Sequence, residues 1–478
     1  GSITTIGENS WGIHNEGDTN TNTVSGSIKT TGKDGYGIYN EGDNNITTMS
    51  GSITTTGRDG YGIYNKGNTN TNTVSDTGSI TTTGREGHGI WNWGDTNTTT
   101  MSGSITTSGE DGYGIYNRGD TNKTTMSGSI TTSGKDAYGG IYNWGSTNIT
   151  TMSGSITTSG EDGYGIYNRG DTNKTTMSGS ITTSGEDGDG IYNRGDTNIT
   201  TMSGSITTSG ESAYGIYNRG DTNTTTVSGS IKTSGDLGHV IYNNGNSNTT
   251  EMSGSIIATG LQVYAIADEG NSNKTTISGI ISINVDDYTG TLDPEDIAYG
   301  AGMGYIAGGN NNTATISGSI TSVRPYAYGA VTMGLNNSIA ISGTVKASGS
   351  KSVALYALTG DGGTFTLNEG AVIIGEIKSA NKTIAEAQQP STNSKLVFNL
   401  GASTSYAYNI AGNGVGTGAG QWTYSDLDGR TQVVTAGITG CDLSVEKYGY
   451  STPTVCNLVT AVGVGFASNA EVQNELSY

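Results

Sequence analysis

The chain has 478 residues, of which 79 are glycine, four are proline and 13% are charged. Its 42 acidic residues outnumber the 22 basic ones, the formal net charge is −20, and we see no basic stripe in the sequence. Such a chain repels phosphate groups and anionic lipids, which argues against nucleic-acid partners. No apolar run reaches the roughly 18 residues that a membrane-spanning helix requires.

The sequence opens inside a repeat. Residues 1–5 already belong to a repeat unit without a preceding signal peptide, so we expect a mature or trimmed fragment. Each unit begins with a glycine, a small residue and an aliphatic residue, and most units are 25 residues long. The units begin at Gly1, Gly26, Gly51, Gly78, Gly103, Gly128, Gly154, Gly179, Gly204, Gly229, Gly254, Gly279, Gly318 and Gly343, with a degenerate start at Gly370.

Two stretches of each unit alternate with a period of two, which indicates β-strands. In the unit that starts at Gly154, one stretch centres on Ile166, and the other runs from Thr175 into the next unit as far as Thr182. One unit is too thin to bury its aliphatic residues, whereas stacked units cover one another. The repeat therefore predicts an all-β parallel β-helix of about fourteen to fifteen coils, with interior columns headed by Ile3, Ile13 and Val24. We expect the glycines near positions 7 and 17 of each unit to occupy turns with positive φ.

Asparagine recurs at two positions of each unit, exemplified by Asn168 and Asn173. Stacked side-chain amides can form hydrogen-bonded ladders along the axis. The alternative is glycosylation, because Asn173-Lys174-Thr175 and similar triplets match the acceptor pattern. We favour ladders, since a threonine-rich repeat produces such triplets by its composition alone.

Trp93, Arg118 and Trp144 occupy the same position in successive units, where other units place Glu16, Glu41, Lys66 or Arg169. A position that accepts glutamate and lysine faces solvent. Neighbouring strands lie about 4.8 Å apart, so we expect Arg118 to stack between the two indoles. Exposed tryptophan and arginine are enriched in binding hot spots, which makes the trio a candidate site for proteins or glycans. The alternative is a cation–π stack that only seals the coils.

Short hydroxyl side chains repeat in rows such as Thr176-Ser178-Ser180-Thr182. They predict a flat face with little side-chain entropy to lose, on which copies of the chain could associate. The alternatives are an ordinary exposed strand surface and an ice-binding array. Because the net charge opposes association, salt should strengthen it. The candidate residues are Ser129, Thr131, Ser155, Thr157, Ser180, Thr182, Ser205 and Thr207.

The sequence does not predict an enzyme. Its three histidines, His14, His88 and His239, lie in coils far apart, so they form no cluster with a nucleophile. Asp171 and its equivalents form a column of carboxylates, but Arg169 and its equivalents lie two residues before them and should offset the repulsion. Because no calcium-binding spacing occurs, we expect neither a metal nor another cofactor.

The pattern changes toward the C-terminus. Residues 1–378 form the repeat domain, from which an acidic segment at about 285–300 is expected to project as a loop. Residues 379–478 lose the repeat, and we interpret them as a β-rich capping and folding region. Cys441 and Cys456 lie 15 residues apart and predict a disulfide in an oxidising compartment, with two buried free thiols as the alternative.

The Gly-Ser-Ile-Thr-Thr coils, the Gly-Asp-Thr-Asn turns and the β-rich end at 362–377 and 396–434 resemble the passenger domains of bacterial autotransporters, the type V secretion system. The resemblance implies a right-handed β-helix, export and display at the cell surface. It also implies a membrane β-barrel downstream of residue 478. The Gly-Asp-Ser-Gly pattern of the protease-bearing members is missing from the sequence.

The predicted function is therefore a non-enzymatic, surface-displayed adhesin or self-association module. Its expected partners are copies of itself on neighbouring cells, or host and surface glycans or proteins. A structural surface-layer or fibre subunit is the second hypothesis, and an ice-binding array is the third. A polysaccharide-cleaving enzyme is a distant fourth.

Overall fold

The computed structural model describes residues 1–284, 302–349, 351–358, 363–368 and 370–379, together with five later strands between Lys395 and Ala461. The chain divides into two compact units, Gly1–Ile241 and Tyr242–Tyr478. It is an all-β parallel β-solenoid of about 14 turns with a spacing of about 25 residues, as predicted. The hand of the coil and the expected boundary at 378–379 stay predictions.

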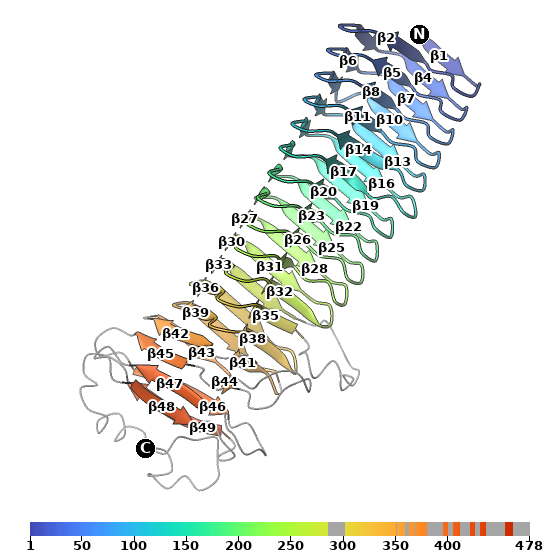
Figure 1. Ribbon diagram of the computed structural model, residues 1–478. Coiled ribbons are helices and arrows are strands. Elements are labelled where there is room, and N and C mark those ends of the chain that lie inside the picture. The colour runs from blue at the N-terminus through green and yellow to red at the C-terminus, as the bar shows by residue number, and fades with distance from the viewer. Residues whose placement is uncertain are drawn as a thin grey trace. The chain divides into compact units, whose positions relative to one another are not determined.

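Each coil of the first unit contains three short strands, one in each of three parallel sheets (Figure 1). Sheet A consists of β1 (Ser2–Thr5), β4 (Ser27–Thr30), β7 (Ser52–Thr55), β10 (Ser79–Thr82), β13 (Ser104–Thr107), β16 (Ser129–Thr132), β19 (Ser155–Thr158), β22 (Ser180–Thr183), β25 (Ser205–Thr208) and β28 (Ser230–Thr233). Sheet B consists of β2 (Ile13–Glu16), β5 (Ile38–Glu41), β8 (Ile63–Lys66), β11 (Ile90–Trp93), β14 (Tyr113–Arg118), β17 (Gly139–Trp144), β20 (Ile166–Arg169), β23 (Ile191–Arg194) and β26 (Ile216–Arg219). Sheet C consists of β3 (Thr21–Val24), β6 (Ile46–Met49), β9 (Thr71–Val74), β12 (Thr98–Met101), β15 (Lys123–Met126), β18 (Ile149–Met152), β21 (Lys174–Met177), β24 (Ile199–Met202) and β27 (Thr224–Val227).

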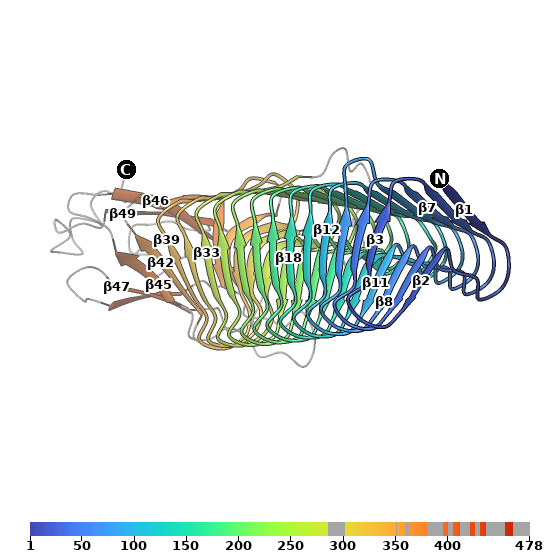
Figure 2. The same cartoon turned by 90° about the horizontal axis from the view of Figure 1, so that it is seen from above.

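The stretch that we predicted to be one strand from Thr175 to Thr182 is two strands. β21 ends at Met177 and belongs to sheet C, whereas β22 begins at Ser180 and belongs to sheet A. Figure 2 shows β3, β12 and β18 of sheet C on a different side of the first unit from β7 of sheet A. The prediction was wrong because inward and outward side chains keep alternating through the bend at Ser178-Gly179.

The predicted interior columns are confirmed. Residues pair with their equivalents in the next coil, so that Ile156 lies opposite Ile181, Ile166 opposite Ile191, and Met177 opposite Met202. These side chains are almost completely buried. Each buried aliphatic side chain contributes about 1.5–3 kcal/mol relative to an exposed one.

Asparagine ladders fill the polar part of the interior. The Nδ2 of Asn168 donates to Oδ1 of Asn193 at 2.8 Å and to Oγ1 of Thr175 at 3.0 Å. In the second column, Oδ1 of Asn173 accepts the backbone N–H of Asn148 at 2.8 Å. Both columns are buried. The Asn168 column forms the predicted amide ladder, whereas the Asn173 column bonds to the backbone of the preceding coil instead.

The glycine prediction is correct at position 17 and wrong at position 7. Gly170, at position 17, has a φ of 143°. Gly185, at position 7, has no positive φ, but a Cβ there would lie 1.7 Å from the carbonyl oxygen of Gly160 in the preceding coil. Close approach of coils therefore requires that glycine. The left-handed conformation instead recurs at residues with side chains, such as Thr172 with a φ of 57°.

The second unit repeats the three-strand coil, and β29 (Ile241–Asn244) lies where the two units divide. Its sheet A strands are β31 (Ser255–Ala258), β34 (Ile280–Ile283), β37 (Ser319–Ser322), β40 (Thr344–Ala347) and β43 (Val372–Ile374). Its sheet B strands are β32 (Val263–Asp268), β35 (Gly302–Ala307), β38 (Ala327–Thr332), β41 (Val353–Ala357), β44 (Glu376–Ser379), β46 (Ser405–Ala411) and β49 (Val455–Ala461). Its sheet C strands are β30 (Thr249–Met252), β33 (Lys274–Ile277), β36 (Thr313–Ile316), β39 (Ser338–Ile341), β42 (Thr364–Asn368), β45 (Lys395–Asn399), β47 (Gln421–Ser425) and β48 (Thr431–Thr435).

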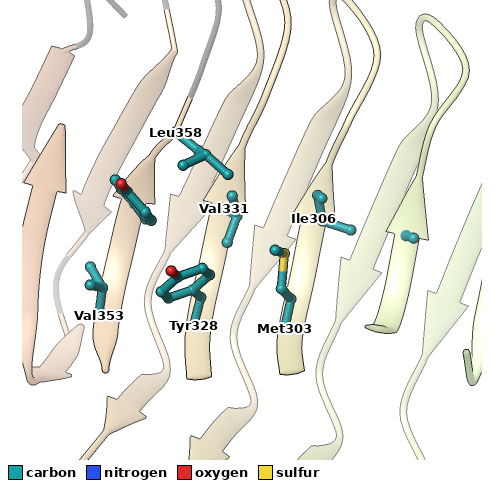
Figure 3. Packing of buried hydrophobic residues seen from close by; sticks show 8 residues of the cluster. Met303, Ile306, Tyr328, Val331, Val353 and Leu358 are labelled. Carbon is teal, nitrogen blue, oxygen red and sulfur yellow. The ribbon is translucent and has the colours of Figure 1, made fainter. Parts of the chain in front are cut away.

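The second unit changes its packing and its strand pairing. Strands β35, β38 and β41 carry a cluster of buried aliphatic and aromatic residues that includes Met303, Tyr328 and Val353 (Figure 3). Near the C-terminus, β46 pairs with β49 and β47 with β48 in antiparallel fashion. The expected acidic loop at 285–300 and the expected Cys441–Cys456 disulfide lie outside the described residues, apart from the backbone of β49 at Cys456.

Candidate binding face of sheet B

The outer side of sheet B in the first unit carries two neighbouring columns of side chains. In β20, Ile166 and Asn168 point into the core, so Tyr167 and Arg169 lie on the opposite side of the pleat. The parallel register repeats this arrangement in each coil, where Tyr167 lies opposite Tyr192 and Arg169 opposite Arg194. The face therefore has an aromatic column beside a column of charged residues and tryptophans.

The aromatic column comprises His14, Tyr39, Tyr64, Trp91, Tyr116, Tyr142, Tyr167, Tyr192 and Tyr217. Its rings stack from coil to coil, as Tyr167 and Tyr192 do with centroids 4.7 Å apart and planes 9° apart. A second set of aromatic rings packs against this column, as Tyr36 does against Tyr39 and Tyr61 against Tyr64, each three residues before its partner. Burial raises the pKa of Tyr36 to about 12, with nearby Asp34 contributing, so these phenols stay neutral at physiological pH.

Trp93, Arg118 and Trp144 form the stack that their spacing predicted. The Arg118 Cζ lies 4.6 Å from the ring centroid of Trp93 and 5.3 Å from that of Trp144. The indoles are 42% and 40% exposed, respectively. The structure thus brings the three candidate residues together at the surface, while their role in binding stays a prediction.

The stack is longer than the sequence analysis proposed. Arg169 lies on the other side of Trp144, with its Cζ 4.2 Å from the ring centroid, and its Nη1 donates to the Tyr142 hydroxyl at 3.5 Å. Arg194 and Arg219 continue the same position in the next two coils. We call Trp93, Arg118, Trp144, Arg169, Arg194 and Arg219 the arginine–tryptophan column. The arginines of this column form a basic stripe, so the expectation that the chain has none was wrong. The 25-residue spacing of Arg169, Arg194 and Arg219 is the signal in the sequence that could have revealed it.

The aspartate column has a different role from the one predicted. Oδ1 of Asp171 accepts the backbone N–H of Asp196 at 2.8 Å, and Oδ1 of Asp196 accepts that of Asp221 at 2.7 Å. These carboxylates thus join successive turns. Within residues 1–241, no ion pair connects Arg169 with Asp171, so the arginines offset the carboxylates at most through space.

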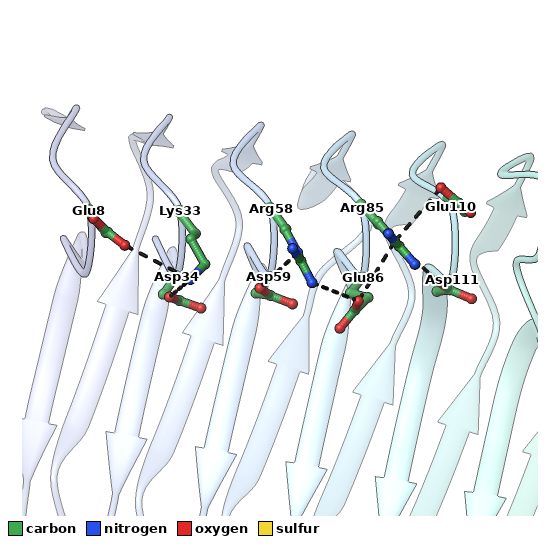
Figure 4. A network of polar contacts seen from close by, with 9 residues as sticks. All are labelled: Glu8, Lys33, Asp34, Arg58, Asp59, Arg85, Glu86, Glu110 and Asp111. Carbon is green, nitrogen blue, oxygen red and sulfur yellow. Dashed lines mark hydrogen bonds and ion pairs between the residues drawn. The ribbon is translucent and has the colours of Figure 1, made fainter.

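A second group of cations, Lys33, Arg58 and Arg85, lies at the opposite edge of the coils, in the turns before the sheet B strands, and is paired with acids. Arg58 contacts Asp59 and Glu86, both at 3.4 Å, and Arg85 contacts Glu110 at 3.7 Å and Asp111 at 3.5 Å (Figure 4). In contrast, Arg118 and Arg169 of the arginine–tryptophan column lie over indole rings, and Arg169 also hydrogen-bonds to the Tyr142 hydroxyl. A cation–π contact positions a guanidinium without neutralising its charge.

The hydroxyl residues of sheet A form aligned rows. Ser129 lies opposite Ser155, and the same register continues to Ser180 and Ser205 in the following coils. Thr131, Thr157, Thr182 and Thr207 form the parallel row. All eight side chains are exposed or half-buried. The bend before each sheet A strand limits the flat part of this face to residues of sheet A.

The comparisons with known proteins show a fold. No family model and no curated protein matches the sequence. One chain of a solved structure, described as "The cryo-EM structure of the Vag8-C1 inhibitor complex", is similar with a TM-score of 0.52 and 14% sequence identity. The match covers 83% of this chain and 99% of that chain. It shows a shared architecture.

Two of the three histidines, His88 and His239, are buried. Burial lowers the pKa of His88 and of His239 to about 3, so both imidazoles are neutral at physiological pH. The His88 Nδ1 already accepts the backbone N–H of Tyr113 at 3.2 Å. Among the residues whose placement is described, no three His, Cys, Asp or Glu side chains are grouped as metal ligands, and no helix could span a membrane.

Proposed function

We propose that this chain is a non-enzymatic, cell-surface binding module of the autotransporter passenger type, acting as an adhesin through the outer face of sheet B. The observation that carries the proposal is the exposure of Trp93 and Trp144 in a stack with Arg118 and Arg169. The interior columns already stabilise the coils, so two large exposed indoles are unnecessary for folding. Exposed tryptophan and arginine side by side are typical of binding hot spots.

Adhesion of cells that display the full chain tests this proposal. We expect the double variant Trp93→Ser/Trp144→Ser to reduce attachment to cultured cells or glycan-coated surfaces by about tenfold, with an unchanged melting temperature. The matched control is Ile149→Ser/Ile199→Ser, which removes two similarly exposed apolar residues from sheet C. Equal attachment of the parent and the tryptophan variant would reject a binding role for the stack and leave it a structural role alone.

Self-association is a second candidate function, favoured by the aligned hydroxyl rows of sheet A. Two such faces would form many polar contacts, each contributing about 0.5–1.5 kcal/mol. Because the net charge of −20 opposes association, its strength should rise with salt. Sedimentation at low and high salt measures this, and charged substitutions at Ser155, Ser180 and Ser205 should abolish any dimer, whereas alanine substitutions should not. A monomer at high protein concentration under both conditions excludes the hypothesis.

A further inference from the structure

We infer that the arginine–tryptophan column binds a linear polysaccharide that carries anionic groups, either carboxylates or sulfates, along the axis of the coils. The inference rests on the proposed binding role of this face and specifies its ligand. The neighbours of the indole rings determine which parts of the rings a ligand could contact.

The ring faces of the tryptophans are already occupied. Trp144 has Arg118 over the ring from the preceding coil and Arg169 over the ring from the following coil, at 5.3 and 4.2 Å. Trp93 has Arg118 at 4.6 Å and also stacks with Trp91, with ring centroids 5.5 Å apart. A sugar ring or a nucleobase that stacks on Trp144 would therefore have to displace a guanidinium group, and one face of Trp93 is likewise taken by Arg118. What remains for a ligand is the edges of the indoles and of the guanidinium groups.

Guanidinium edges are donors that match anionic oxygens. Each guanidinium presents N–H groups in a planar fork that suits carboxylate or sulfate oxygens, and arginine does not lose its charge at physiological pH. Arg118, Arg194 and Arg219 are exposed and Arg169 is half-buried. The hydroxyl of Tyr142 lies beside the column, where it accepts a hydrogen bond from Arg169. The tryptophans are thus positioning residues for the forks.

The spacing of the cations favours an extended polymer over a single small anion. Arg169, Arg194 and Arg219 occupy successive coils about 4.8 Å apart, and Arg118 lies two coils before Arg169. Such a row engages several charges of one chain at once, and linked contacts raise the overall affinity above that of a single contact. The neighbouring Asp171 and Asp196 each accept a backbone N–H from the following coil.

Single-stranded nucleic acid is the other polyanion to consider. Its binding sites combine cations with aromatic faces on which bases stack, and those faces are covered in this column. The geometry therefore favours a polymer that offers charge and hydroxyl groups without requiring a stacking platform.

The experiment titrates the purified full chain with polygalacturonate, dextran sulfate, neutral dextran and an oligothymidine, at low and high salt. The column variant replaces Arg118, Arg169, Arg194 and Arg219 with glutamine. The matched control replaces Lys33, Arg58, Arg85 and Lys135 with glutamine, which removes the same formal charge from the opposite edge of the coils. Melting temperatures establish that both variants are folded.

We expect one or both anionic polysaccharides to bind, with affinity that falls as salt rises, and neutral dextran not to bind. The column variant should lose about tenfold or more in affinity, the control less than about twofold. Trp93→Ser/Trp144→Ser should weaken binding about threefold at unchanged charge, because the forks lose their positions. Whether polygalacturonate or dextran sulfate binds more tightly distinguishes carboxylate from sulfate recognition.

Equal losses in the column variant and the control would overturn the inference, since net charge alone would then explain binding. Tighter binding of the oligothymidine, binding of neutral dextran, or no binding of either polyanion would overturn it as well. In each of these cases, reduced cell adhesion by the tryptophan variant would still support the proposed adhesive function. If the polysaccharide experiment fails and the tryptophan variant also adheres as well as the parent, both proposals are rejected.

Discussion

Individual residues in this protein are constrained by their equivalents in the adjacent coils. Asn168 donates to Asn193, and Tyr167 stacks on Tyr192, so each of these side chains contacts and positions its equivalent in the next coil. A residue that differs in type from its equivalents in the adjacent coils therefore cannot make the contacts that they make. Asp189 is such a residue, because it takes the column position that Tyr164 and Tyr214 occupy in the coils on either side.

Asp189→Asn should stabilise the protein at neutral pH. Burial raises the pKa of the Asp189 carboxyl well above its ordinary value, with Asp187 and Asp162 adding to the shift, although its Oδ1 accepts the backbone N–H of Tyr214 at 2.7 Å. Because the folded pKa lies above the unfolded one, the folded chain binds more protons between the two values, and its stability falls as pH rises through that window. The advantage of the variant in urea denaturation should therefore grow from acidic to neutral pH.

The matched control for this measurement is Asp171→Asn. Asp171 also accepts a backbone N–H, from Asp196, but it is exposed. Its substitution should leave the pH dependence of stability nearly unchanged. An advantage of Asp189→Asn that is the same at every pH would contradict the assignment of the effect to a buried carboxyl.

Thr172→Asn should stabilise the protein by about 0.5–1 kcal/mol. Thr172 has a φ of 57°, a conformation that is costly for a β-branched residue and that asparagine tolerates better. Asn44 and Asn311 already occupy equivalent left-handed positions, at φ values of 59° and 56°. Thr176→Asn in strand β21 is the control and should be neutral or destabilising, since asparagine is unfavourable in strands. The urea unfolding midpoints of the two variants, each compared with that of the parent, test this prediction.

At the scale of the strands and turns, the coil depends on three short strands joined by tight bends. The bends bring backbone directly against backbone, which glycine alone permits at Gly185. A different bend, at Ser178-Gly179, separates the hydroxyl rows of sheet A from the strands of sheet C. The flat face available for association is consequently narrower than the alternating pattern suggested.

Gly185→Ala should destabilise the first unit by about 1–3 kcal/mol or more. The added Cβ would lie 1.7 Å from the carbonyl oxygen of Gly160, so that neighbouring coils would have to separate locally. Ser184→Ala, at the exposed neighbouring position, should have little effect. Equal unfolding midpoints for the two variants would contradict this prediction, because neighbouring coils would then separate locally without a loss of stability.

At the scale of the whole molecule, the repeated coil makes stability nearly a sum of coil and neighbour contributions. Strands β19, β22 and β25 pair in register from coil to coil, and the junctions Ser178-Gly179 and Ser203-Gly204 are chemically identical. Removal of one complete coil therefore recreates an existing junction, whereas removal of part of a coil shifts every later residue out of its column.

Deletion of residues 179–203 should give a folded protein whose melting temperature lies within about 5 °C of the parent. Deletion of residues 179–190, which ends inside the coil, should abolish cooperative folding of the first unit, because Ile and Asn columns no longer align. Circular dichroism melts compare the two. A similar loss of structure in both would contradict the modular description.

The sequence by itself determined the parallel coil, its spacing, the interior Ile and Met columns, the asparagine ladders and the stack of Trp93, Arg118 and Trp144. These features follow from periodicity, because equivalent residues of a parallel solenoid must lie one strand apart. Only the tertiary structure decided where the backbone bends, which glycine is required by close approach, and that Arg169 stacks on Trp144 instead of pairing with Asp171. Alternation reports the side to which a residue points, whereas bends and partners depend on distances between backbones that no linear pattern contains.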